Sequence, residues 1–186
     1  MKKKDFINLI NENFYNPDIK EEYILYLEKC CKIGIPFILN IEHLGEIVGI
    51  KRKILLYFML FTNKYYREFK IPKRSGKWRK INSPYPALSM VQRWILDNIL
   101  TRIALDDAAK GFIKNISIKD NVLVHINKKC LLKIDMKDFF PSITLRRIIS
   151  IFLNLGYPHK ISYFLAKLCC KDDCLPQGGI NKPLFK

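Results

Sequence analysis

The residues best suited to chemistry lie in residues 133–143, KIDMKDFFPSI. Residues 130–134 are apolar except for one lysine, and they lead directly to Asp135, with Asp138 three residues later. A carboxylate at the exit of a buried strand is unfavourable unless a cation or hydrogen-bond donors compensate its charge. Mg²⁺ suits this position because it takes oxygen ligands, often only one or two protein carboxylates beside substrate phosphates. The pattern therefore predicts a strand over residues 130–135 that ends at a metal-binding carboxylate.

A second group of candidate residues lies upstream, in residues 69–81, FKIPKRSGKWRKI. The segment predicts a β-hairpin with its turn at Ser75-Gly76. Alternate residues of a strand face one side, so Lys77 and Arg79 share a face and Trp78 lies opposite. Such a hairpin can hold phosphates, because arginine grips them through two parallel N–H groups and lysine acts as a point charge. The alternative is an exposed charged hairpin. Its basic side chains are Lys70, Lys73, Arg74, Lys77, Arg79 and Lys80.

A third candidate segment is residues 175–179, LPQGG. A glutamine beside glycine can reach a ligand while the backbone approaches closely, which makes Gln177 and Gly178 candidates for nucleotide contact. Taken alone, Leu-Pro-Gln-Gly is an ordinary turn, and only its position after residues 133–143 gives it weight.

These three segments, in this order, resemble parts of the reverse transcriptases. Residues 133–143 are similar to motif A of that family, residues 69–81 to its fingers hairpin and residues 175–179 to the start of its motif B. The sequence DFFPSI, with residues 85–100 and 108–125, resembles the retron and group II intron branch. The resemblance covers roughly residues 65–179. It implies template-directed DNA synthesis on RNA, with dNTPs as substrates, a nucleic-acid primer and two Mg²⁺ ions.

The resemblance also implies roles for individual residues. Asp135 and the backbone carbonyl of Met136 would hold the metal. Phe140, five residues after Asp135, matches the ring that rejects a 2′-hydroxyl, although a core aromatic is the alternative. Asp138 would lie near the triphosphate or only cap backbone amides. The implied nucleotide contacts are Lys73, Arg79, Asp138, Phe140, Gln177 and Gly178, and the implied nucleic-acid contacts are Lys70, Arg74, Lys77 and Lys80.

One part of the family pattern is missing. The family's third acidic block, Tyr-x-Asp-Asp, lies after LPQG, whereas this sequence continues for only seven residues beyond Gly179 and lacks it. Two metal ions ~3.5–4 Å apart are not readily held by one carboxylate. We therefore expect a fragment, truncated before the third catalytic motif, that does not polymerise alone. A non-catalytic RNA-binding remnant is the alternative, and an RNA-dependent RNA polymerase is disfavoured by the aromatic residue at position 140.

The charge of the chain indicates a polyanionic partner. The formal net charge is +16, from 33 basic and 17 acidic side chains. Residues 1–60 carry nine basic and eight acidic side chains, and residues 61–186 carry 24 and nine. The positive charge therefore lies with the motifs and favours phosphate contacts. The sequence shows neither a membrane-spanning segment nor a signal peptide, so a cytoplasmic protein is expected. Six cysteines then read as thiols, and their spacing matches no usual zinc site.

The elements that must position these residues predict an α+β fold. Apolar residues at three- and four-residue spacings make residues 1–62 a helical N-terminal region, broken at Gly34 and Pro36. Residues 63–186 would form fingers and a partial palm, with helices over 88–103, 148–155 and 160–168, a short strand at 111–113 and a helix beginning at Ser117 with Asp120 as partner. The retron branch is preferred over group II introns. It implies a cognate structured RNA and a role in phage defence; the sequence does not indicate an oligomeric state.

Overall fold

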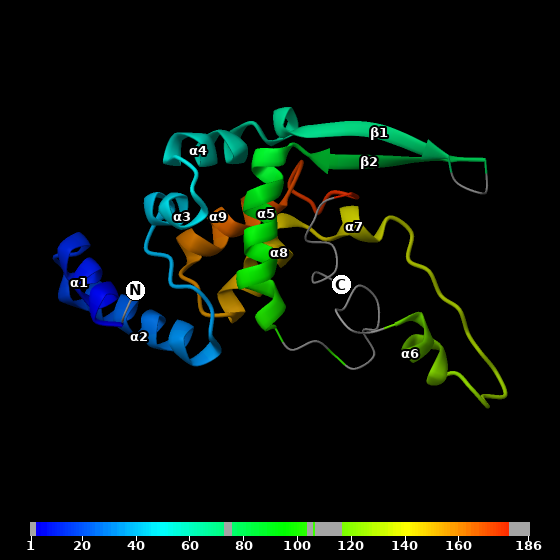
Figure 1. Cartoon of the computed structure of the whole chain (residues 1–186), viewed down its shortest axis with the longest axis horizontal. Coiled ribbons are helices and arrows are strands. Elements are labelled where there is room, and N and C mark those ends of the chain that lie inside the picture. Colours follow the sequence, from blue (N-terminus) through cyan, green and yellow to red (C-terminus); the bar gives the residue numbers. More distant parts are fainter. Residues whose placement is uncertain (1–2, 73–75, 104–105, 107–116, 179–186) are drawn as a thin grey trace.

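Helices make up most of the fold, and one antiparallel hairpin extends from them (Figure 1). The structure, a computed structural model, describes residues 3–72, 76–103, 106 and 117–178. Its elements are α1 Lys3–Asn13, α2 Pro17–Ile33, α3 Ile41–Val48, α4 Arg52–Leu60, the 3₁₀ helix η1 Thr62–Tyr65, β1 Tyr66–Pro72, β2 Trp78–Pro84, α5 Pro86–Asn98, the 3₁₀ helix η2 Leu100–Arg102, α6 Ile118–Leu123, α7 Phe139–Ser142, α8 Leu145–Asn154 and α9 His159–Cys169.

Local sequence signals set the ends of the N-terminal helices. Asn16 caps α2 through its side chain, with Pro17 in the first turn, and Gly34 ends the helix in a left-handed conformation at φ +78°. Asn40 and Gly49 begin and end α3 in the same way. The predicted helical region and its break after residue 33 are therefore confirmed.

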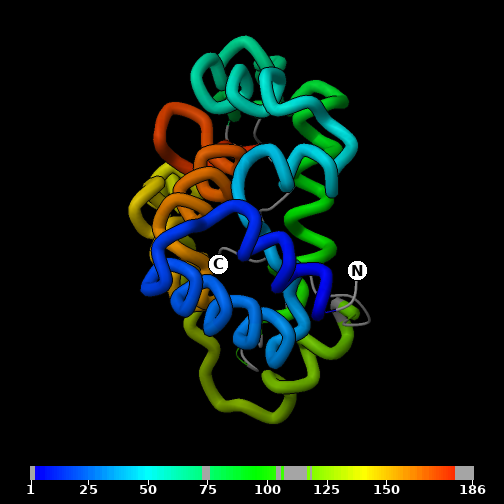
Figure 2. The backbone as a smooth tube through the Cα atoms, turned by 90° about the vertical axis from the view of Figure 1, so that its left-hand side faces the viewer, coloured from blue at the N-terminus to red at the C-terminus, as the bar shows by residue number. Residues whose placement is uncertain are grey.

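The core joins the N-terminal helices to α5, α8 and α9. The helices α8 and α9 pack against each other, and α9 also contacts α4 and α5. Leu44, Ile95, Phe152 and Leu165 are all fully buried in this one apolar cluster. Figure 2 shows α1 and α2 (blue) lying in front of α9 (orange). The Tyr157 hydroxyl donates to the Pro36 carbonyl at 2.9 Å, which ties the two ends of this core together.

The predicted hairpin is present and is longer than expected. β1 and β2 pair antiparallel, with Pro72 opposite Trp78 and Tyr66 opposite Pro84. Of the predicted turn, Gly76 has φ +79°, whereas Ser75 lies outside the described residues. The helices predicted over 88–103, 148–155 and 160–168 are present as α5, α8 and α9, although α5 ends at Asn98 and the short 3₁₀ helix η2 follows it.

The buried strand predicted over residues 130–135 is wrong. These residues have no assigned secondary structure, and Leu131, Leu132 and Ile134 are 68%, 82% and 77% exposed. A strand needs a neighbour for its backbone groups, and within the described ranges no strand pairs with this segment. The segment runs as an extended loop from α6 to α7 (Figure 1).

Helix α6, from which that loop starts, was predicted from the sequence. The Ser117 side chain and Asp120 form a reciprocal capping box at the start of α6. The short strand predicted at 111–113 lies outside the described residues. At the coarse level the α+β prediction is confirmed, as helices with a small antiparallel sheet. Among the helices of the described part, none combines the length and apolar character that a bilayer-spanning segment needs.

Candidate nucleotide-binding site

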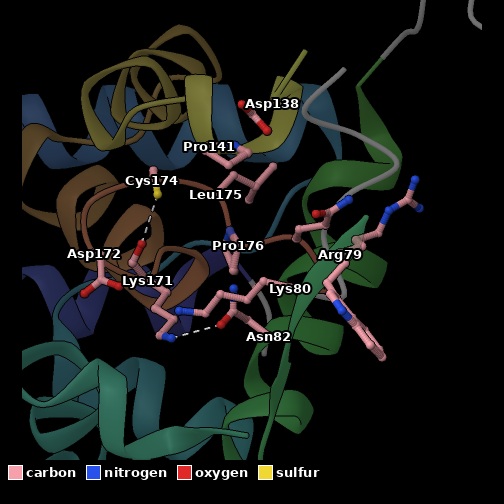
Figure 3. Close-up of a pocket in the computed structure, with 12 residues that line it drawn as sticks. Arg79, Lys80, Asn82, Asp138, Pro141, Lys171, Asp172, Cys174, Leu175 and Pro176 are labelled. Carbon is pink, nitrogen blue, oxygen red and sulfur yellow. Dashed lines mark hydrogen bonds between the residues drawn. The ribbon is translucent and has the colours of Figure 1, made fainter. Parts of the chain in front are cut away.

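The structure gathers several of the predicted residues around one hollow of about 320 Å³, here called the hairpin hollow. Three separate segments line it: strand β2, the turn before α7 and the loop after α9 (Figure 3). Figure 3 shows Arg79 on one side of it and Asp172 on the other. The lining residues are Trp78, Arg79, Lys80, Asn82, Asp138, Pro141, Lys171, Asp172, Cys174, Leu175, Pro176 and Gln177.

The LPQG loop is attached directly to strand β2. The Asn82 backbone N–H donates to the Gln177 carbonyl at 2.7 Å. Gly178 follows at φ +114°, and a Cβ built there would lie 2.6 Å from the Asn82 carbonyl oxygen. Only glycine fits this conformation and this close approach without displacing backbone. Gln177 and Arg79 both line the hairpin hollow.

The turn that carries Asp138 is attached to the same loop. The Leu175 N–H donates to the Ile143 carbonyl at 3.0 Å, and the Leu145 N–H donates to the Asp173 carbonyl at 2.8 Å. Asp138 itself has φ +51° and occupies the N-cap position of α7, yet its side chain makes no capping hydrogen bond. The capping role is therefore absent here, and Asp138 lines the hairpin hollow.

A buried lysine connects the loop to the hairpin. Lys171 is only 5% exposed, forms an ion pair with Glu68 on β1 and donates to the Asn82 side-chain oxygen at 2.9 Å. Glu68 also pairs with Lys80 at 2.9 Å. The hydrogen bond from Lys171, followed by the one from Lys80, lowers the pKa of Glu68 to about 2. The sequence analysis missed Lys171 and Asn82, because nothing in their local pattern distinguishes them from solvated polar residues.

A second polar contact anchors the base of the hairpin to the helical core. The buried Gln92 side chain on α5 donates to the Tyr66 hydroxyl at 2.7 Å and to the Leu168 carbonyl at 2.9 Å. Burial raises the pKa of that hydroxyl well above its usual value. The strand that carries Arg79 is therefore held in place through its partner strand.

The remaining predicted residues lie elsewhere. Asp135 and Met136 are exposed in the extended loop and do not line the hairpin hollow. Phe140 is half-buried, packs on the core and makes an edge-to-face contact with Phe139 at 5.4 Å. Lys70 and Lys77 are exposed on the hairpin. Lys73 and Arg74 lie outside the described residues.

The acidic residues that the structure describes do not form a multi-ligand cluster. In the part of the chain that the structure describes, no three His, Cys, Asp or Glu side chains come together as a metal site would require. The Asp172-Asp173 pair lies in the turn after α9, where Asp173 pairs with Lys167 at 2.5 Å.

Comparison with known proteins identifies the family. The family described as "Reverse transcriptase (RNA-dependent DNA polymerase)" matches residues 71–185 of this chain, well over half of its length. The chain belongs to the reverse transcriptase family. The match spans strand β2, the turn with Asp138 and the LPQG loop, which are the segments that line the hairpin hollow.

Similar reverse transcriptases come from bacterial retrons. The chain is 33% identical over 153 residues to the retron Ec86 reverse transcriptase of Escherichia coli, covering 81% of this chain and 48% of that protein. It is 35% identical over 139 residues to the retron Mx162 reverse transcriptase of Myxococcus xanthus, covering 73% and 29%. The retron Mx65 enzyme of the same organism is 32% identical over 72% of this chain and 31% of its own length. The chain thus spans less than half of these relatives.

Proposed function

We propose that the hairpin hollow binds the triphosphate of an incoming dNTP in an RNA-directed DNA polymerase. One observation carries this proposal. Arg79, Asp138 and Gln177 were each singled out from a different segment of the sequence, and all three line one hollow of about 320 Å³. That volume lies at the small end of the range for ligand sites.

Each residue has a role that its chemistry allows. Arg79 would hold phosphate oxygens through two parallel N–H donors, and Lys80 would add a second positive charge. Gln177 would contact the base or sugar through its amide. Lys171 would support the site indirectly, because it contacts Glu68 and Asn82 on the two strands of the hairpin that forms one wall of the hollow. Lys73, Phe140 and Gly178 complete the proposed nucleotide contacts.

The carboxylates at this end of the molecule fit part of a magnesium site. Asp138 lies at the hollow that Arg79 also lines, and Asp135 is an exposed carboxylate three residues before it. Mg²⁺ takes such oxygen ligands together with substrate phosphates. Asp135 and the Met136 carbonyl would hold the ion, which when bound supplies electrostatic stabilisation of the transferring phosphoryl group.

For the whole protein we propose the activity that its relatives' names state. A retron-type reverse transcriptase would copy a cognate structured RNA in the cytoplasm from a nucleic-acid primer, and a role in phage defence goes with that branch. Lys70, Arg74, Lys77 and Lys80 on the hairpin would contact the nucleic acid, because they are a basic group without an intervening acid. Residues 1–62 would support fingers and partial palm in residues 63–186.

Nucleotide binding tests the site. Trp78 lines the hollow and is 64% exposed, so its fluorescence should report a dNTP titration with Mg²⁺ in a Trp94→Phe background. Arg79→Ala should weaken binding about 10-fold or more, since a hydrogen bond to a charged group contributes ~1.5–3 kcal/mol. Arg67→Ala is the matched control, because Arg67 is exposed on the partner strand away from the hollow. Equal affinities for the two variants would contradict the proposal.

Primer extension tests the chemistry. We propose that residues 1–186 alone give no Mg²⁺-dependent product, because Asp135 is one carboxylate where two metal ions need more. Clear incorporation would refute this. In the whole polymerase, Asp135→Ala should abolish synthesis, whereas a non-catalytic RNA-binding remnant would keep its salt-sensitive RNA binding after the same change.

A further inference from the structure

Two aromatic rings with a lysine at each end form a row along one side of α4 and η1. Lys53, Tyr57, Phe61 and Lys64, spaced four, four and three residues apart, form it, and we call it the lysine–aromatic row. The Lys53 ammonium lies 5.9 Å from the Tyr57 ring centre, and the Lys64 ammonium lies 5.3 Å from that of Phe61. The two rings are 5.8 Å apart and tilted by 35°.

The row lies on the surface and is not part of the core. Tyr57 and Phe61 are 40% and 46% exposed, whereas Leu55, Phe58 and Met59 turn the other side of α4 into the core. Proteins bind single-stranded nucleic acid through exposed rings flanked by ammonium groups, because bases stack on the rings and phosphates pair with the charges.

A second hollow, of about 360 Å³, opens beside Phe61, and we call it the α4 hollow. Thr62, Asn63 and Lys64 line it, together with Asp172 and the ion pair of Lys167 with Asp173. Carboxylates repel phosphate but accept hydrogen bonds from the N–H groups of a base. The hollow therefore offers the Asp172 carboxylate and the Asn63 amide to the edge of a base, and Lys64, which lines it, is available to a neighbouring phosphate.

The local charge agrees with this arrangement. Between positions 47 and 67 the chain carries five basic side chains and no acidic one. The nearby Glu42 is paired with Arg52 at 2.6 Å, and Asp173 is paired with Lys167. The net charge of residues 1–60 is close to zero, but the positive charge is concentrated at the end of this helical region.

We propose that the lysine–aromatic row and the α4 hollow form a second nucleic-acid site, which takes one unpaired nucleotide of a single strand. The base stacks on Phe61 within the hollow, with Asn63 and Asp172 at its edge, and Lys53 and Lys64 hold the flanking phosphates. Asp172 lines both hollows, so a strand at the α4 hollow lies next to the proposed nucleotide site. The site is distinct from that nucleotide site and does not require it.

Binding of a fluorescent 12-nucleotide oligo(A), as RNA and as DNA, to the 186-residue chain tests this by anisotropy. The titration is done at about 200 mM salt, where contacts to phosphate alone are weak. Phe61→Leu keeps an apolar side chain but removes the stacking face, and it should weaken binding about fivefold or more. Phe61→Trp should retain binding. Lys64→Gln should reduce the slope of log affinity against log salt by ~0.7, the value for one contact on a single strand.

The controls separate this site from general basic charge and from the nucleotide site. Tyr15→Leu removes a 94% exposed aromatic outside the row and should change nothing. Phe61→Leu should leave dNTP affinity unchanged, whereas Arg79→Ala should lower it. Photo-crosslinking of a 4-thiouridine oligonucleotide to the unaltered chain should mark Tyr57 or Phe61. Unchanged oligonucleotide affinity in Phe61→Leu, or crosslinks confined to the hairpin, would overturn the proposal. Equal affinity for RNA and DNA supports stacking without sugar recognition, and a preference for either supports an additional sugar contact at the same site.

Discussion

The wall of the hairpin hollow and the loop that carries Asp135 are both parts of the proposed active site, but they differ in the contacts that hold them. The wall is built from contacts between distant segments: Asn82 with Gln177, Leu175 with Ile143, and Lys171 with Glu68. The loop over residues 128–136 has no such support from the described residues, and Leu132 at its centre is 82% exposed. Among the described residues, internal contacts therefore hold the proposed phosphate side of the site but not the proposed metal side.

The difference shows that apolar composition does not make a strand. Residues 130–135 have the apolar character of a buried strand, yet strand formation also requires backbone partners. β1 and β2 supply such partners to each other, and Gln92 and Lys171 fix them to the core. Exposed apolar segments of this kind mark contact surfaces.

The largest expected effect compares the two regions directly. Leu165→Ala, at a fully buried position of α9, should lower the free energy of unfolding by about 2–5 kcal/mol, because it leaves a cavity. Leu132→Ala makes the same chemical change in the exposed loop and should cost less than about 0.5 kcal/mol. Urea unfolding followed by circular dichroism measures both. Similar losses for the two variants would mean that the loop is packed in solution.

A smaller effect is expected where the LPQG loop, residues 175–179, meets the hairpin. Gly178→Ala places a Cβ against the Asn82 carbonyl at a strained φ and should destabilise this contact by about 1–3 kcal/mol. Hydrogen exchange at the Asn82 amide, which donates to Gln177, should become faster. Gly49→Ala is the control, because φ is also positive there but nothing lies within 4 Å of the new methyl group. Unchanged exchange at Asn82 would show that the loop is not held as described.

The smallest effect concerns pH. The pKa of Glu68 is lowered from 4.5 to about 2 by Lys171 and Lys80, so its ionised form is favoured in the folded state. The resulting stabilisation is present above pH 4.5 and is lost as the pH falls toward 2. The urea midpoint of Glu68→Gln should therefore lie below that of the unaltered chain at about pH 6.5, and the gap should close between about pH 4.5 and 2. A gap that stays constant over this range would remove Glu68 as its cause.

Much of the fold could be predicted from short-range signals. Asn16 and Gly34 mark the ends of α2, Ser117 and Asp120 begin α6, and the alternating segment around Gly76 forms a hairpin, because caps and turns depend on neighbouring residues. Two residues of the proposed nucleotide site were also predictable, since Arg79 and Gln177 lie in segments that resemble a known family.

The sequence by itself therefore determined the family, the helices and the chemistry available in each segment. Only the tertiary structure decided which of these segments meet. It placed Lys171 and Asn82 where they support the hairpin hollow, and it placed the lysine–aromatic row beside the α4 hollow. It also left residues 130–135 without a partner strand among the described residues. The physical reason is that capping and turn preferences act over a few residues, whereas strand pairing and the burial of a charged side chain depend on partners far away in the chain.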